Sequence, residues 1–107
     1  MYRQIRKFKV WDKTLGKFIN FETLPVVDFN SPLYEFLQFT GLTDSKGKEV
    51  WEGDIIQRKN QWDLDLKAIV TYQPPEFVAK LNGSDYNLFN FNNIQVIGNI
   101  FENPELV

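Results

Sequence analysis

The stretch FLQFTGLTDSKGKEVWEGDII, residues 36–56, decides the fold of this protein. Its apolar and aromatic residues come in short runs, and residues typical of tight turns separate the runs. Such a pattern predicts short antiparallel strands. Glycine tolerates a left-handed backbone and aspartate accepts N–H groups in turns, so six positions, five of them in this stretch, are expected to form the reversals. These turn-forming residues are Gly41, Asp44, Gly47, Gly53, Asp54 and Gly98.

The same pattern of strands and turns continues on both sides of this stretch. Residues 6–21 are expected to form a hairpin with Gly16 at positive φ. Pro74 and Pro75 should keep the corner between two later strands open, because proline cannot donate to a strand ladder. The final strand contains a glycine, which indicates a bend or a bulge. The remaining strands are expected at residues 36–40, 49–52, 55–58, 66–72, 76–81 and 94–101.

Helical signals are few. Ser31 before Pro32 is typical of a capped helix start, so residues 31–35 are expected to form one short helical turn. Residues 82–93 are predicted as a loop, with a strand or a helical turn around Leu88. We therefore predict an all-β (mainly β) fold in a single domain, residues 1–107. It should be a small, partly open SH3-like barrel or a strongly bent antiparallel sheet, with at most one short helical turn.

The composition excludes several kinds of chemistry. The 107 residues include no cysteine and no histidine, which rules out disulfides, thiolate zinc sites and histidine general bases. Glycine-rich phosphate loops are also missing, so we expect no cofactor, no metal, no catalytic residue and no small-molecule substrate. No apolar run reaches the roughly 20 residues of a membrane helix or resembles a signal peptide. The protein is expected in the cytoplasm, without membrane contact.

The net charge of −2 conceals an asymmetry. Residues 1–17 carry six basic side chains and one acidic side chain, which gives +5 and leaves −7 for the rest. A nucleic-acid-binding module that uses this basic first hairpin is therefore one hypothesis, although the basic start could equally pair with the acidic remainder. Trp62 lies between polar residues and is expected to be exposed. The candidate contact surface consists of Arg6, Lys7, Lys9 and Trp62.

A metal-dependent nuclease is a third hypothesis. Asp54 begins one predicted strand, and Asp63, Asp65 and Lys67 lead into another. Two acids that hold Mg²⁺ beside a lysine that supports an attacking water would suit such a reaction. Alternating charged and apolar residues are also what any strand with one solvated face shows, and this interpretation is the simpler one.

Three motifs resemble the YopX family of phage and prophage proteins. They span residues 38–56, 96–106 and 5–12, and one departure is Lys9-Val10 in place of the family's usual Arg-Ala. The resemblance implies a bacterial virus or prophage as the source, with self-association, and brings no known reaction. The leading expectation is thus a non-enzymatic accessory protein, a homo-oligomer acting through contacts with a protein partner that the sequence does not identify. Within the motifs, turn formation explains the glycines and aspartates, while residues 52–54 or 99–103 are the alternative binding surface.

Overall fold

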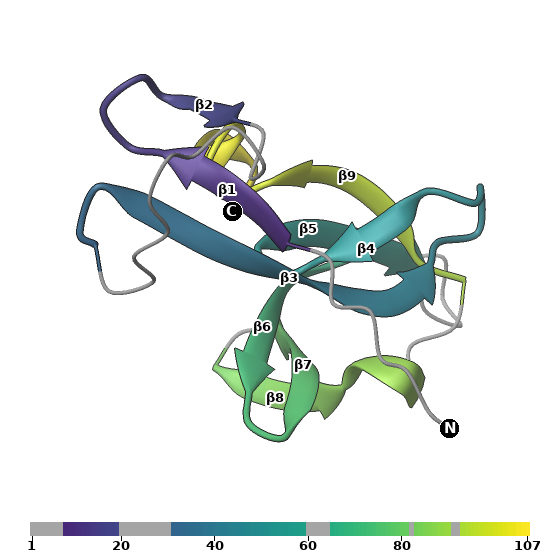
Figure 1. Cartoon of the computed structure of the whole chain (residues 1–107). Helices are drawn as coiled ribbons and strands as arrows, with labels where there is room; N and C mark the ends of the chain where they lie inside the picture. Colours follow the sequence, from purple (N-terminus) through teal and green to yellow (C-terminus); the bar gives the residue numbers. More distant parts are fainter. Residues whose placement is uncertain (1–7, 20–30, 60–64, 82, 91–92) are drawn as a thin grey trace.

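The computed structural model describes residues 8–19, 31–59, 65–81, 83–90 and 93–107. They form two antiparallel sheets, which confirms the all-β class (Figure 1). The first sheet has four strands in the order β2-β1-β3-β4. Its strands are β1 (Phe8–Asp12), β2 (Lys17–Ile19), β3 (Tyr34–Thr43) and β4 (Glu49–Trp51).

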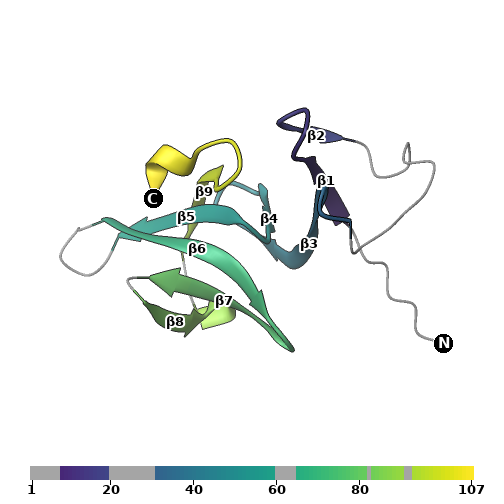
Figure 2. The same cartoon turned by 90° about the vertical axis from the view of Figure 1, so that its left-hand side faces the viewer.

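The second sheet has five strands in the order β8-β7-β6-β5-β9 and is strongly bent, as Figure 2 shows along β6. Two single-turn 3-10 helices accompany it among the described residues, and the first of them confirms the helical turn predicted around Leu88. The strands are β5 (Asp54–Lys59), β6 (Asp65–Gln73), β7 (Glu76–Leu81), β8 (Ser84–Asn87) and β9 (Gln95–Asn99), and the helices are η2 (Leu88–Asn90) and η3 (Pro104–Leu106).

The predicted first hairpin is confirmed for its described part, β1 and β2. Asp12 pairs with Lys17 across the two strands. The Asp12 Oδ1 atom accepts the backbone N–H groups of Thr14 and Leu15 at 2.9 and 3.0 Å. Gly16 has a φ of 68°, the left-handed conformation that the turn requires. Local sequence chemistry therefore determines this hairpin.

The predicted helical turn at residues 31–35 is wrong, because β3 begins at Tyr34. The Ser31 hydroxyl accepts the Leu33 N–H at 3.2 Å, which makes a short turn and not a helix. The strand also continues beyond Gly41, so the assignment of Gly41 to a turn is wrong. Its φ of 89° is instead taken up where the register against β4 shifts. β3 is long because it is paired on both sides, with β1 and with β4.

The corner at Pro74 and Pro75 is closed, contrary to the prediction. Gln73 pairs with Glu76, so the two prolines form the whole turn between β6 and β7, and the peptide bond between them is cis. Because neither proline occupies a paired position, the ladder needs no N–H donor from them, and both are tolerated in the turn.

The predicted irregularity in the last strand is a β-bulge. Ile55 lies opposite Gly98 and Ile56 opposite Val96, so β9 has an extra residue at Ile97. Gly98 lies within β9 and has no left-handed φ, so its assignment to a turn is wrong. A Cβ atom at this position would lie 2.6 Å from Asn103 Oδ1. Gly98 is therefore needed for close approach of the C-terminal segment.

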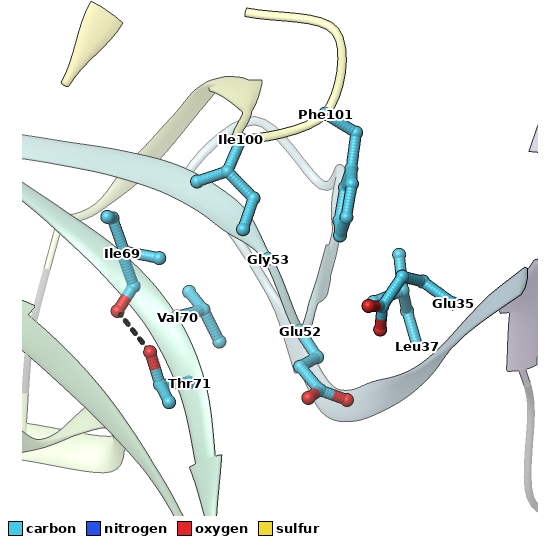
Figure 3. Close-up of a pocket in the computed structure, with 9 residues that line it drawn as sticks. All are labelled: Glu35, Leu37, Glu52, Gly53, Ile69, Val70, Thr71, Ile100 and Phe101. Atoms are coloured by element: carbon cyan, nitrogen blue, oxygen red, sulfur yellow. Dashed lines mark hydrogen bonds between the residues drawn. The ribbon is translucent and has the colours of Figure 1, made fainter. Parts of the chain in front are cut away.

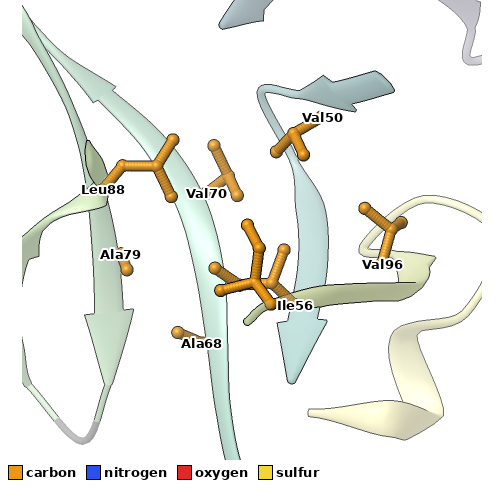
Figure 4. Packing of buried hydrophobic residues seen from close by; sticks show 8 residues of the cluster. Val50, Ile56, Ala68, Val70, Ala79, Leu88 and Val96 are labelled. Atoms are coloured by element: carbon orange, nitrogen blue, oxygen red, sulfur yellow. The ribbon is translucent and has the colours of Figure 1, made fainter. Parts of the chain in front are cut away.

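A buried apolar core lies on the inner face of the five-stranded sheet (Figure 4). Val50 of β4 reaches it from the other sheet and is completely buried. Leu88 of η2 is also completely buried and closes the core at its far side. The buried members are Val50, Ile56, Ala68, Val70, Ala79, Leu88, Ile94 and Val96.

Candidate functional site

The two sheets meet at the turn formed by Glu52 and Gly53, between β4 and β5. The Glu52 N–H donates to the Gln38 carbonyl at 2.9 Å, and the Gly53 N–H donates to the Val70 carbonyl at 2.7 Å. The Gly53 carbonyl in turn accepts the Ile100 N–H at 2.9 Å. This turn therefore holds β3, β6 and the segment after β9 in fixed positions relative to one another.

A pocket of about 200 Å³ lies beside this turn (Figure 3). β6 forms one wall and β3 the other, and the segment after β9 lies over it. Most of the lining is apolar, but two glutamates contribute carboxylates. The lining residues are Glu35, Leu37, Glu52, Gly53, Ile69, Val70, Thr71, Ile100 and Phe101. The two segments that the sequence offered as an alternative binding surface thus both contribute to this pocket.

The two glutamates of the pocket have different surroundings. Burial and the negative charge of Glu35 raise the pKa of Glu52, although the Gln38 N–H bound to Glu52 Oε1 at 3.2 Å opposes the shift. Glu35 forms an ion pair with Lys13 at 3.2 Å, in which both side chains are about half exposed. The sequence did not indicate that the two glutamates line one pocket, because they lie far apart in the chain.

Asp54, at the start of β5, is a buried carboxylate with one described hydrogen bond. Its side chain is 5% exposed, and Oδ2 accepts the Trp51 N–H at 2.7 Å. Burial raises the pKa of Asp54 to about 6, although this hydrogen bond and the charges of Lys9 and Lys48 oppose the shift. Asp54 takes the turn-forming role that the sequence indicated, and it does so with an energetically costly charge.

Asp44, in the turn between β3 and β4, is bound more completely. Its Oδ1 accepts the N–H groups of Lys46 and Lys48 at 2.9 and 2.8 Å, and its Oδ2 accepts the Val96 N–H at 2.9 Å. Burial disfavours the charge, but these donors outweigh it and lower the pKa of Asp44. Gly47 completes the turn with a φ of 82°. Asp44 therefore also joins the first sheet to β9.

Of the predicted contact surface, the structure describes Lys9 alone. Lys9 Nζ lies 4.7 Å from the centre of the Trp51 ring and 5.3 Å from that of Phe18, so this lysine stacks on the protein's own aromatic side chains. Arg6, Lys7 and Trp62 lie outside the described residues.

The acids of the nuclease hypothesis are also separated. β5 and β6 are antiparallel, with Lys59 opposite Asp65, so Asp54 and Asp65 lie near opposite ends of β5, roughly 16 Å apart along the strand. Lys67 faces Gln57 in the middle, and Asp63 lies outside the described residues. The register therefore keeps Asp54 and Asp65, the two described acids of the hypothesis, at opposite ends of a strand pair.

The outer strand β8 forms a second candidate site, in a segment that the sequence predicted as a loop with a strand or a helical turn around Leu88. All four of its residues are exposed, and it lies at the edge of the five-stranded sheet. Tyr86 in β8 is 45% exposed, and Phe89 in the adjoining η2 is 56% exposed. We call Ser84–Asn87 and Phe89 the β8 edge. The asparagine-rich sequence has low strand propensity, so only pairing with β7 reveals it.

Comparison with known proteins now places the chain. The YopX protein family model matches residues 25–107. The chain belongs to the YopX family. The matched span contains both sheet-joining turns and the β8 edge, while the resemblance at residues 5–12 lies outside it.

A solved structure shares the fold of this YopX-family chain. The crystal structure of protein EF1440 from Enterococcus faecalis is similar with a TM-score of 0.65 and 24% identity, over 97% of this chain and 99% of that chain. No curated protein matches the sequence. Among the described residues, no helix has the length and apolarity to cross a membrane.

Proposed function

We propose that this YopX-family protein is a non-enzymatic phage or prophage accessory protein that works through protein contacts in the bacterial cytoplasm and self-associates through the β8 edge. The observation that carries the proposal is an exposed outer strand bordered by exposed aromatic side chains. A strand at the edge of a sheet can accept a strand from another molecule.

The β8 sequence is compatible with pairing to a second copy of itself. An antiparallel pair about a two-fold axis between Asp85 and Tyr86 places Ser84 opposite Asn87 and Asp85 opposite Tyr86. The Asp85 carboxylate is bound by Lys80 at 3.0 Å and by Gln73 at 2.9 Å. Pairing of the two β8 strands therefore brings together no carboxylates that lack a partner.

The exposed aromatic side chains provide apolar contact area at the same edge. Tyr86 and Phe89 are separated by only two residues, and both are about half exposed. Aromatic side chains contribute much of the binding energy of protein interfaces. Burial of these two rings would thus add to the backbone hydrogen bonds of the paired strands.

Sedimentation velocity over a range of protein concentrations tests this proposal. We expect reversible dimers, and we expect Tyr86→Lys with Phe89→Lys to raise the dimer dissociation constant at least about tenfold. Leu15→Lys with Leu33→Lys is the matched control, because these two leucines are similarly exposed but lie in turns next to strands of the first sheet. A monomer at all concentrations, or equal weakening by the control, would overturn the proposal.

Nucleic-acid binding through the first hairpin has less support, since Lys9 and Lys13 have partners within the protein. If it occurred, binding to single-stranded DNA would fall steeply with added salt and would be lost on charge reversal of Arg6, Lys7 and Lys9. No binding near about 50 mM salt would exclude it.

A further inference from the structure

We infer that the pocket beside Glu52 and Gly53 binds the arginine side chain of a partner protein. The inference rests on the proposed function only in that the ligand belongs to a protein. It does not involve the β8 edge, so either site can fail its test without the other.

The size of the pocket fits one side chain. Its volume of about 200 Å³ is below the roughly 300–1,000 Å³ of sites for small molecules. Ile69 and Val70 of β6 form one wall, and Leu37 of β3 faces them (Figure 3). These apolar walls suit the three methylene groups of an arginine side chain, which pack on apolar surface while the charged end stays near polar groups.

The charge of the pocket favours a cation. Glu35 and Glu52 are its only charged lining residues among those described. Glu52 Oε1 accepts the Gln38 N–H, and no described residue donates a hydrogen bond to the other carboxylate oxygen. Burial and the charge of Glu35 raise the pKa of Glu52, so a cation would relieve an unfavourable charge there. The ion pair of Glu35 with Lys13 is half exposed, and such pairs exchange at little cost.

The shape of the pocket favours arginine over lysine. The guanidinium group is planar, and its five N–H donors can reach two carboxylates at once. Phe101 presents an aromatic ring to the same pocket, and an arginine head group can stack on it. This ring is held from outside by Trp11, with 5.5 Å between ring centres. Lysine has a compact ammonium group and would use neither feature fully.

The position of the pocket is rigid. Gly53 has a φ of 88°, and a Cβ atom there would lie 2.8 Å from Phe101. The backbone of the Glu52–Gly53 turn is hydrogen-bonded to β3, to β6 and to Ile100. The acidic and the aromatic sides of the pocket therefore keep their spacing, as a preformed site requires.

Titration of the full chain with three short peptides, followed by NMR chemical shifts of the backbone amides, tests the inference. The peptides are acetyl-Ala-Arg-Ala-amide, its lysine analogue and its citrulline analogue, which has the same shape as arginine without the charge. We expect the arginine peptide to bind at least about tenfold more tightly than the citrulline peptide and measurably more tightly than the lysine peptide. The shifts should centre on Glu52, Thr71 and Phe101.

Isosteric variants locate the binding. Glu52→Gln and Glu35→Gln should each weaken binding of the arginine peptide about tenfold, since each removes a charged acceptor. Glu76→Gln is the matched control, because Glu76 is exposed on β7 and does not line the pocket. A well-dispersed amide spectrum shows that each variant is folded. Equal weakening by the control would overturn the assignment.

Other outcomes would also overturn the inference. Equal binding of the arginine and citrulline peptides would show that the positive charge does not contribute. Equal binding of the arginine and lysine peptides would show that the guanidinium group does not contribute. If the arginine peptide binds only after Arg3→Gln with Arg6→Gln, this protein's own arginine, from the same or a second copy, is the occupant. In that case the partner assignment is wrong.

Discussion

Asp44 and Asp54 are two buried aspartates in neighbouring turns, and their surroundings shift their pKa values in opposite directions. The Asp44 carboxylate accepts three backbone N–H groups, and its charge is stabilised. The Asp54 carboxylate accepts one from Trp51, and its burial dominates. Asp44 thus has three N–H donors that offset the cost of burying its charge, whereas Asp54 has one.

The two turns also connect different parts of the molecule. The Asp44 turn reaches β9 through Val96 and so joins residues 52 positions apart in the chain. The Asp54 turn adjoins Glu52 and Gly53 and borders the pocket. The first turn therefore contributes to stability through its carboxylate, whereas the second positions the backbone of the candidate site.

The largest expected effect comes from truncation of the two carboxylates. Asp44→Ala should lower the free energy of unfolding by about 4 kcal/mol, because three N–H groups lose a charged acceptor. Asp54→Ala should lower it by only about 1 kcal/mol, since the loss of one hydrogen bond is offset by removal of a buried charge. Urea unfolding at pH 7 measures both. Equal losses would contradict the distinction between the two turns.

A smaller effect is expected from pH. The pKa of Asp54 is raised from 3.8 to about 6, so the folded state holds its proton more tightly than the unfolded state. This proton contributes at most about 3 kcal/mol to the free energy of unfolding. The contribution is fully present below about pH 4 and is lost as the pH rises through about 6. Asp54→Asn removes this dependence and keeps an acceptor for the Trp51 N–H. Its stability relative to the wild type should rise between pH 4 and 7.

Asp44 serves as a control, because its pKa is shifted in the opposite direction. Its pKa is lowered, so its contribution is present above about pH 4 and is lost as pH falls through the lowered pKa. Asp44→Asn should therefore lose stability relative to the wild type at pH 7 and approach it in acid. Unfolding curves at matched pH values measure both differences, and parallel trends for the two variants would contradict the opposite shifts.

The smallest effect concerns the glycine of each turn. Gly47 and Gly53 have φ values of 82° and 88°, so alanine is strained at both. A Cβ atom at Gly47 meets nothing within 4 Å, whereas one at Gly53 meets Phe101 at 2.8 Å. Gly47→Ala should cost about 1 kcal/mol and Gly53→Ala about 1 kcal/mol more. Thermal unfolding compares them, and equal costs would show that Phe101 moves freely.

The sequence predicted strands and turns correctly where neighbouring residues determine them. Residues 76–81 form β7 with the predicted bounds, and the first hairpin follows from Asp12 and Gly16. The start of β3 was mistaken because Ser31 and Pro32 are typical of a helix start, and pairing with β1 and β4 overrides that signal. The β8 edge was missed because its residues have low strand propensity.

The sequence by itself determined the all-β class, the family and the turns at Asp44 and Asp54, because turn chemistry acts over a few residues. Only the tertiary structure decided which strands these turns join, since their contacts with residues far away in the sequence depend on strand register. Register places Asp54 far from Asp65, Lys9 on Trp51, and Glu35 with Glu52 in one pocket. These contacts join segments that lie far apart in the chain, so no single short run of residues specifies them.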